Sequence, residues 1–283
     1  REIFAFFING AKERAPAAAL ALLGALLVPY LMFTRQHHAL EKLTAVWLLP
    51  IVAPEVAASA AGSLAPHLDA AAAQQLLVAG FVLWGLSLSL AFSLITLVLL
   101  RLALHKLPDT DFAATSWLPL GPLATGCLGL LSMGHAAPMA FAGTPLLSAA
   151  ELARDLGLIG GLALWGAGLW WLVIATLFTR HYIRDNMPFN LGWWGFTFPL
   201  GVFALATFEL QAVTGLSLFA FIGLLLAVLG GVGSWWFGLP YMTSGHLDLE
   251  LPLVGLVPLA SALVFDTGVY FVVFSGTLLM LAT

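Results

Sequence analysis

The sequence predicts an all-α integral membrane protein, and composition is the first reason. Of its 283 residues, 61% are hydrophobic and 8% are charged, whereas soluble domains carry about 25% charged residues. The mean hydropathy is +1.01. Apolar runs of roughly 20 residues, the length that crosses a bilayer as a helix, recur between short polar connections. These observations predict about eight transmembrane helices, arranged as helical hairpins.

The predicted spans are, in chain order, residues 16–34, 45–64, 76–100, 116–133, 156–178, 191–208, 217–237 and 259–281. Residues 1–15 form a polar, amphipathic leader without the pattern of a cleavable signal peptide. Lysine and arginine gather in the connections after the first, third and fifth spans. The positive-inside rule therefore predicts that these connections are cytoplasmic. The basic residues of the leader conflict with that orientation, because they would then lie outside.

Three predicted spans share an aromatic residue, a proline within five positions, and then small residues. The three segments are AVWLLPIVAPEVAA (45–58), TSWLPLGPLATG (115–126) and WWGFTFPLGVFALAT (193–207), and the spans between them contain no proline. A proline inside a helix removes a hydrogen bond. A bilayer tolerates the break only where protein covers it or where it lines a water-filled cavity. The pattern predicts proline-kinked inner helices alternating with straight outer helices; the alternative is that proline is simply commoner in membrane helices.

The segments NLGWWGFTFPLGVFALAT (190–207) and TAVWLLPIVAPEVAASAAG (44–62) carry a family resemblance. Over residues 28–220 the chain resembles the tellurite-resistance and C4-dicarboxylate transporters. These belong to the voltage-dependent anion channel superfamily, together with the plant slow-type anion channels.

The resemblance implies five helical hairpins, with five kinked inner helices around a central pore, and assembly as a homotrimer. It implies transport of small anions: a C4-dicarboxylate such as malate, sulfite or chloride. It also implies that Phe198, the second phenylalanine of FTFP, plugs the pore; the alternative is an ordinary packing aromatic. The chain starts near the family's fourth helix, so the first three helices have no counterpart in it.

The C-terminal part resembles a different family. The stretch FGLPYMTSGHLDLELPLVGLVPLASALVFDTGVYFVVFSGTLLML (237–281) is similar to the end of the B-type subunit of multisubunit sodium/proton antiporters, and the likeness begins near residue 221. The predicted organisation is thus a leader (1–15), an anion-channel-like region (16–220) and an antiporter-subunit-like tail (221–283). The alternative functions are a structural, non-conducting antiporter subunit and a mosaic without function.

Helix-breaking prolines are the first candidate site residues: Pro50, Pro54, Pro119, Pro122 and Pro199. We expect them to leave backbone groups without helical partners inside the bilayer. The N-termini of half-helices carry positive partial charge, which suits anions. No lysine or arginine lies inside a predicted span, so selectivity for anions would arise in this way. The alternative is that the kinks only improve packing.

Two carboxyl groups lie in predicted spans, and ionisable residues at that depth are candidates for function. Glu55 would face the cavity, where it would carry protons in its neutral form or tune the passage of a dianion. Alternatively, a neighbouring helix satisfies its carboxyl group. Asp266 would belong to a proton path or pair locally, and local pairing is the favoured interpretation. Thr197 and Ser59 would line the pore or join helices through their hydroxyl groups.

Several classes of function find no support in the sequence. There is no glycine-rich phosphate loop, no zinc-protease motif and no nucleophile context, so we expect no enzyme activity and no cofactor. Cys127 is the single cysteine and the histidines are scattered, so no metal site is predicted. No basic stripe suggests nucleic acid. The expected partners are the lipid bilayer, small inorganic or organic anions and further copies of the chain, in the bacterial inner membrane.

Overall fold

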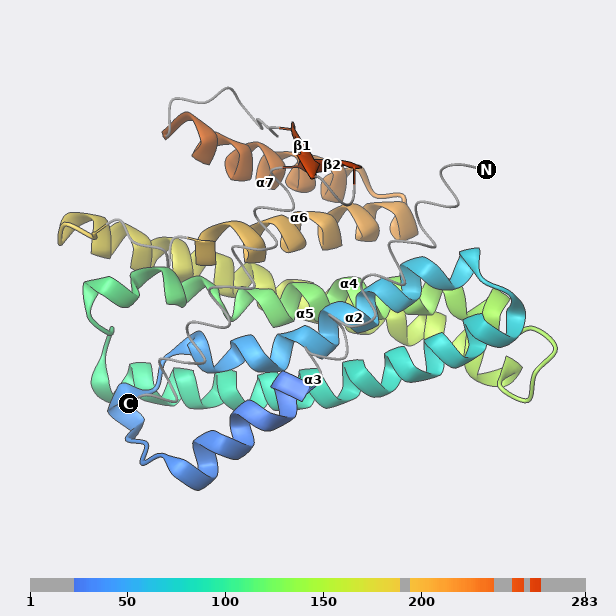
Figure 1. Ribbon diagram of the computed structural model, residues 1–283, viewed down its shortest axis with the longest axis horizontal. Helices are drawn as coiled ribbons and strands as arrows, with labels where there is room; N and C mark the ends of the chain where they lie inside the picture. Colours follow the sequence, from blue (N-terminus) through green and yellow to red (C-terminus); the bar gives the residue numbers. More distant parts are fainter. Residues whose placement is uncertain (1–22, 189–193, 237–245, 252–254, 261–283) are drawn as a thin grey trace.

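The computed structural model describes residues 23–188, 194–236, 246–251 and 255–260 (Figure 1). Its helices are Leu23–Arg35, α2 (Leu49–Leu64), α3 (Ala70–His105), α4 (Leu120–Ala140), α5 (Leu147–Arg184), α6 (Trp194–Thr214) and α7 (Ser217–Trp236). Short 3-10 helices lie between them: η1 (Leu40–Lys42), η2 (Ala45–Leu48), η3 (Ala65–His67) and η4 (Thr110–Trp117). Helices therefore occupy seven of the eight predicted positions.

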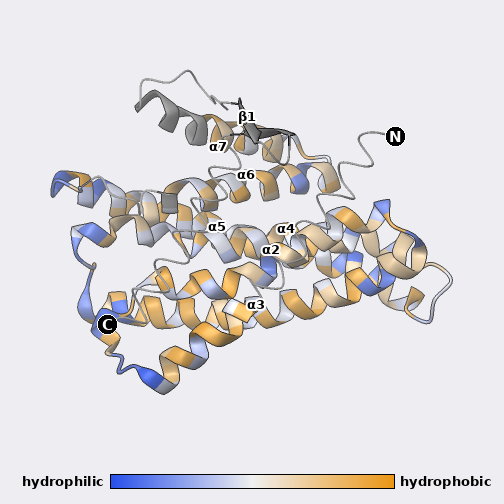
Figure 2. Ribbon diagram, viewed as in Figure 1, coloured by the Kyte–Doolittle hydropathy of each residue, from blue (hydrophilic) through white to orange (hydrophobic). Residues whose placement is uncertain are grey.

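Five helical segments are long and apolar enough to cross a membrane: Ala45–His67, Ala70–His105, Thr110–Ala140, Leu147–Arg184 and Gly195–Thr214. Two shorter apolar helices, Leu23–Arg35 and Ser217–Val228, add to these within the described residues. Figure 2 shows hydrophobic residues along the lengths of the helices and hydrophilic residues at the connections. The count of eight spans stays a prediction, because residues 261–283 lie outside the described part.

Helices α3 and α5 are longer than their predicted spans of 76–100 and 156–178. An apolar window marks only the part that crosses lipid, and each helix continues into polar sequence beyond it. The start of α3 is fixed by Asp69, whose side chain accepts a hydrogen bond from the Ala72 amide at 3.0 Å, as an N-cap residue does. The end of α3 is fixed by Lys106, where φ is 61°.

One part of the tail is not helical. Strands β1 (His246–Leu251) and β2 (Gly255–Ala260) form an antiparallel pair. The last predicted span begins at residue 259, yet residues 259 and 260 belong to β2. A short apolar run fits a strand or a helix equally well, and here residues 259 and 260 pair with residues 247 and 246 of β1. The all-α class therefore describes the bundle, and this short hairpin of the tail is an addition to it.

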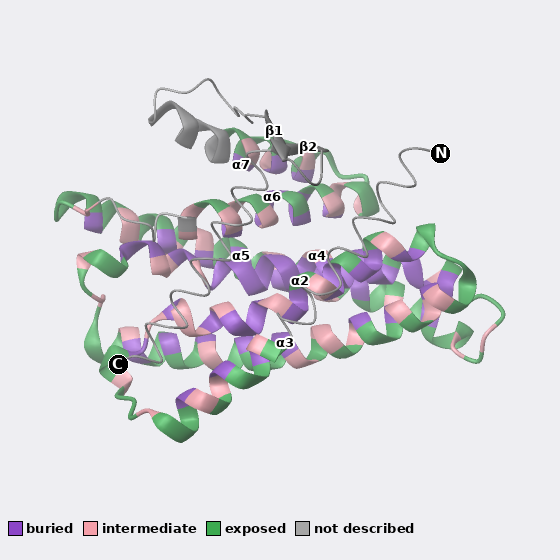
Figure 3. Cartoon of the chain, in the orientation of Figure 1, coloured by how far each residue is buried: buried purple, intermediate pink, exposed green. Residues whose placement is uncertain are grey.

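Helix α4 is the centre of the bundle and packs against α2, α3, α5 and α6. Figure 3 shows it buried along most of its length. The apolar window that includes α4 is 83% buried and that of α2 is 61% buried, whereas those of α3 and α5 are each 28% buried. Burial thus alternates from α2 to α5 in the order that the proline pattern predicts. Helix α6 departs from it at 33%, because α2 and α6 scarcely touch each other and leave one side of α6 uncovered.

Successive helices run in opposite directions, so α2, α4 and α6 are parallel to one another (Figure 1). Their N-termini lie at the end of the bundle where the basic residues gather. We call this the basic end; its cations are Arg35, Lys42, Arg101, Lys106, Arg180 and Arg184. The predicted segregation of charge is therefore a feature of the fold.

Small residues let α2 and α4 approach each other closely, as is typical of helix contacts in membranes. Gly62 of α2 shows how close they come. A Cβ atom placed on it would lie 2.5 Å from the amide nitrogen of Met133 and 2.6 Å from the carbonyl carbon of Ser132. Only a glycine fits against backbone at that distance, so this contact fixes how α2 sits on α4.

Candidate functional site

A groove of about 270 Å³ runs between the three proline-containing helices. Helix α4 forms its floor, and α2 and α6 form its two walls. It is lined by Val56, Ser59, Ala60, Ser63, Thr125, Leu128, Phe198, Val202 and Leu205. The lining is apolar apart from three hydroxyl groups, and it includes no charged side chain. The sequence pattern that predicted inner helices therefore locates a concave surface.

Phe198 lies in this groove, on the wall formed by α6. Its ring is directed toward the floor, since a Cβ atom placed on Gly121 of α4 would lie 3.8 Å from its Cε1 atom. Pro199 follows it inside α6 and is buried. Because the ring is only partly buried and packs at the edge of the core, it occupies the groove without being locked into the protein interior.

The hydroxyl groups of the groove also connect α2 to α4. Ser59 Oγ donates to the carbonyl of Thr125 at 3.1 Å and lies 3.2 Å from the carbonyl of Glu55. Behind this contact, Trp84 of α3 donates its indole N–H to the carbonyl of Gly126 at 2.9 Å. Carbonyl groups of α4 are thus supplied with donors from two neighbouring helices, which holds the floor of the groove in place.

Glu55 lies directly behind the groove rather than in its lining. Its side chain is fully buried, with an exposed fraction of 0%. Its Oε2 atom is 2.9 Å from the hydroxyl of Thr125. Its Oε1 atom has no hydrogen-bond partner and lies against Gly126, where an added Cβ atom would come within 2.8 Å of it. The expectation that Glu55 faces the cavity is therefore wrong for this groove. The alternative, contact with a hydroxyl of a neighbouring helix, agrees with the structure, and that hydroxyl lines the groove.

The prolines do not all break helices. Pro50 lies in the first turn of α2, Pro119 is the N-cap residue of α4, and Pro122 is in the first turn of α4. A proline at the start of a helix costs little, because the first amide groups have no helical partner. Only Pro54 and Pro199 lie inside their helices. The prediction of helix breaks at the other three is wrong: the motif marks where the inner helices begin.

Two other predicted site residues lie elsewhere. Thr197 is exposed and is not part of the groove lining. Asp266 lies outside the described residues. Sequence reasoning did not single out Thr125, although it is the residue that joins Glu55 to the groove. No local pattern in the sequence marks Thr125, because it is one hydroxyl residue among the small residues that follow the second proline motif.

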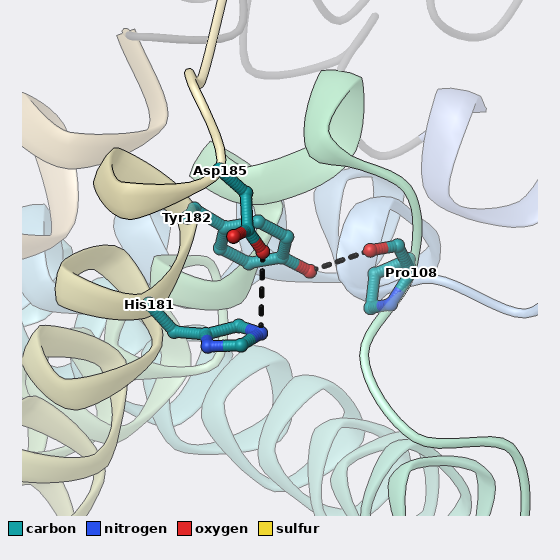
Figure 4. Close-up of polar contacts among 4 residues, drawn as sticks. All are labelled: Pro108, His181, Tyr182 and Asp185. Carbon is teal, nitrogen blue, oxygen red and sulfur yellow. Dashed lines mark hydrogen bonds and ion pairs between the residues drawn. The ribbon is translucent and has the colours of Figure 1, made fainter.

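The basic end carries a second set of polar contacts, away from the groove. The Tyr182 hydroxyl at the end of α5 donates to the carbonyl of Pro108 at 2.8 Å, and the imidazole of His181 lies 3.5 Å from the carboxylate of Asp185 (Figure 4). Nearby, Arg101 donates to the carbonyl of Glu41 at 3.0 and 3.1 Å and to the carbonyl of Lys106. These contacts join connections to helix ends, so we assign them to the framework rather than to the site.

Comparison with known proteins identifies the family. The model of the voltage-dependent anion channel family matches residues 15–244, which is most of the chain. The chain belongs to the voltage-dependent anion channel family. Its members are channels and transporters, and this membership, with the five apolar spans, makes the chain an integral membrane protein of an anion-transport family.

Curated relatives agree with that family. A sulfite efflux pump of Arthroderma otae is 40% identical over 187 residues, which cover 65% of this chain and 49% of the relative. An uncharacterized transporter of Methanocaldococcus jannaschii is 28% identical over 199 residues, covering 70% of this chain and 55% of the relative. The chain therefore spans about half the length of these relatives. No solved structure matches it.

A second similarity involves an antiporter. The B-type subunit of a sodium/proton antiporter of Bacillus subtilis is 42% identical to this chain over 87 residues, which are 29% of this chain and 61% of that relative. The resemblance of the tail to an antiporter subunit is thus confirmed alongside the resemblance of the larger part to anion channels.

Proposed function

We propose that this protein moves small anions across a membrane along the groove between α2, α4 and α6. The observation that carries the proposal is the position of Phe198: the aromatic ring lies in a groove bounded by the three parallel helices of a chain in the anion-channel family. Phe198 and Thr125 lie within the first two turns of α6 and α4 and line the groove. The positive partial charges of these two helix N-termini therefore lie at the same end of the groove.

Sulfite is the first anion we propose, because the relative with 40% identity is named a sulfite efflux pump. Malate or another C4-dicarboxylate and chloride are the other candidates. The groove binds none of them through a full positive charge, since lysine and arginine are absent from its lining. Weak attraction by helix ends and hydroxyl groups suits an ion that must leave quickly. At about 270 Å³ the groove also holds several water molecules, so an ion would remain partly hydrated.

A complete pore needs more wall than the described helices provide, because α2 and α6 leave one side open. We propose that helices outside this chain close it, in keeping with relatives of which the match covers only about half. We further propose a homotrimer in a cytoplasmic membrane with the basic end inside. The relatives come from a fungus, an archaeon and a bacterium, so they support a membrane location without selecting the bacterial inner membrane.

Phe198→Ala tests the proposed gate. In proteoliposomes that contain the purified chain, we expect this change to raise sulfite and chloride flux at least tenfold, because it removes the ring from the groove. Hydrophobic side chains at a constriction block ions sterically and by excluding water. The measurement is the initial rate of anion efflux for equal amounts of reconstituted protein.

The matched control is Phe92→Ala, which removes a phenylalanine from the exposed surface of α3. We expect its flux to equal that of the parent. Equal flux in parent, Phe198→Ala and Phe92→Ala, with all three proteins folded and helical, would contradict a gating role. A rise in both variants would indicate a general leak instead.

A non-conducting subunit of a cation/proton antiporter is the second candidate, and the similarity to the B-type antiporter subunit favours it. The two candidates differ in what they need. A subunit of this kind would depend on the other antiporter subunits for stability and would carry no anion flux alone. Co-expression with such subunits, followed by measurement of the amount of folded chain, separates the two.

A further inference from the structure

The hydrogen bonds around Thr125 favour a protonated Glu55. Oγ1 of Thr125 lies 2.9 Å from the carbonyl oxygen of Gly121 and 2.9 Å from Oε2 of Glu55. A threonine hydroxyl has one hydrogen to donate and two lone pairs that accept. The carbonyl of Gly121 only accepts, and an ionised Glu55 would also only accept, so both would compete for the single hydrogen of Thr125. A protonated Glu55 removes this competition, because it can donate to Oγ1 while Thr125 donates to Gly121.

The surroundings of Glu55 provide only weak support for a negative charge, from the hydroxyl groups of Thr125 and Ser87. Its Oε1 atom has no donor. Another buried hydroxyl, Ser87 of α3, has its hydrogen on the carbonyl of Ile51 at 2.6 Å. An unpaired carboxylate inside a bilayer protein is costly. The neutral acid removes this cost and satisfies the contact to Thr125.

The helices α3 and α4, which pack against α2, offer Glu55 no titratable side chain as a charged partner. Helix α3 carries Arg101 and His105 near its end. Arg101 is 14 residues beyond Ser87, a distance of about 21 Å along a helix. Helix α4 carries Cys127, whose thiol is buried, and His135, which is exposed. Within the described contacts, none of them pairs with Glu55.

We propose that Glu55 is a proton-binding residue that controls the passage of anions through the groove. With its proton, Glu55 is neutral and the groove admits anions. Without it, a negative charge lies behind the lining and repels them. When Glu55 loses its proton, Oγ1 of Thr125 accepts the proton from Oε2 and releases its own hydrogen to water in the groove that Thr125 lines. This inference deepens the proposed function and rests on it.

The size of the effect follows from the distance. An anion in contact with Thr125 Oγ1 would lie about 6 Å from Oε2, because Oγ1 is itself 2.9 Å from Oε2 and a contact adds roughly 3 Å. Two like charges at that separation, with an effective dielectric constant of about 20, lower occupancy on the order of 100-fold. Protonation of one buried carboxyl group is therefore enough to switch the groove between attraction and repulsion.

The test uses Glu55→Gln, which keeps the shape of the side chain, stays neutral at every pH and can donate to Thr125. Its control is Glu209→Gln, which neutralises a half-buried carboxyl group of α6 that does not line the groove. The first readout is the infrared difference spectrum between parent and Glu55→Gln at neutral pH. We expect the parent to show the C=O stretch of a protonated carboxylic acid that the variant lacks, and bands of a carboxylate in its place would overturn the inference.

The second readout is chloride flux against pH, since chloride does not itself titrate. Flux of the parent and of Glu209→Gln should fall by tenfold or more toward alkaline pH, whereas Glu55→Gln should keep its rate. An equal fall in all three proteins would overturn the control of flux by Glu55. Absence of flux from the parent and from Phe198→Ala alike would overturn the proposed function and this control with it, while the infrared band decides the proton site separately.

Discussion

Arg101 shows how a single residue joins two connections at the basic end. Its guanidinium group is 8% exposed and donates to the carbonyl oxygens of Glu41 and Lys106. Lys106 has a positive φ, a conformation that side chains other than glycine seldom adopt. The charged donor from Arg101 helps hold that residue in place and fixes where α3 stops.

Arg101→Met should destabilise the protein by about 2–4 kcal/mol, because it removes charge-assisted hydrogen bonds to two carbonyl groups. The measurement is unfolding by a denaturing detergent in mixed micelles, followed by circular dichroism. Arg180→Met, at an exposed position of α5, is the matched control and should change the free energy of unfolding by less than about 0.5 kcal/mol. Equal effects of the two changes would show that the contacts of Arg101 contribute nothing.

At the same scale, the sequence located some site residues better than others. Phe198 lies in the groove, where an aromatic residue before a helix-interior proline had marked it as a candidate, and its role as a gate stays a prediction. Thr197, its neighbour, was wrongly grouped with it, since adjacent helical residues point about 100° apart. Thr125 was missed because a lone threonine among small residues has no signal of its own. Its importance comes from a contact with Glu55, 70 residues away in the chain.

At the scale of the element, the aromatic–proline motif marks where inner helices begin. In α2 and α4 the tryptophan lies in a 3-10 turn and the first proline follows at the helix start. Proline is tolerated there, so the first prolines of these two motifs position helix N-termini rather than break helices. Periodicity and composition could predict that these helices exist. They could not predict the exact residue at which each helix starts, because proline occurs both at kinks inside helices and in the first turn of helices.

Close packing of α2 on α4 should make Gly62 intolerant of any side chain. Gly62→Ala places a methyl group less than 3.0 Å from the backbone of Ser132 and Met133, which cannot move without shifting α4. We expect a loss of roughly 1–3 kcal/mol, measured by the same detergent unfolding. Gly85→Ala on α3 is the control, since nothing lies within 4 Å of the added atom. Its expected effect is neutral or slightly stabilising, as alanine favours a helix; a similar loss there would remove the steric explanation.

For the whole molecule, composition and the distribution of basic residues predicted most of the architecture. The membrane class, seven helix positions and the gathering of cations at one end all agree with the structure. The short hairpin of the tail did not follow from apolar runs, because a run of this length fits a strand or a helix equally well. Which residues border the groove depends on the packing of α4, and no local pattern shows that.

The orientation of the whole molecule can be measured with single cysteines. Cys127 is the only native cysteine in the sequence and is buried, so it gives little background. His37→Cys lies in an exposed connection at the basic end, and Ala142→Cys lies in an exposed turn at the opposite end. In intact cells, a maleimide that cannot cross membranes should label Ala142→Cys and spare His37→Cys, because basic connections stay in the cytoplasm. The reverse labelling pattern would show that the protein has the opposite orientation, with the basic end outside the cell.

The length of α5 has a consequence for the lipids around the protein. Its 38 residues make a helix about 57 Å long, whereas the hydrocarbon layer is about 30 Å thick. The helix therefore extends beyond the hydrocarbon layer, and Arg180 and Arg184 are exposed near one of its ends. Cations close to a bilayer surface attract anionic phospholipids. The composition of the leaflet, and not only its thickness, then determines how firmly the basic end is anchored.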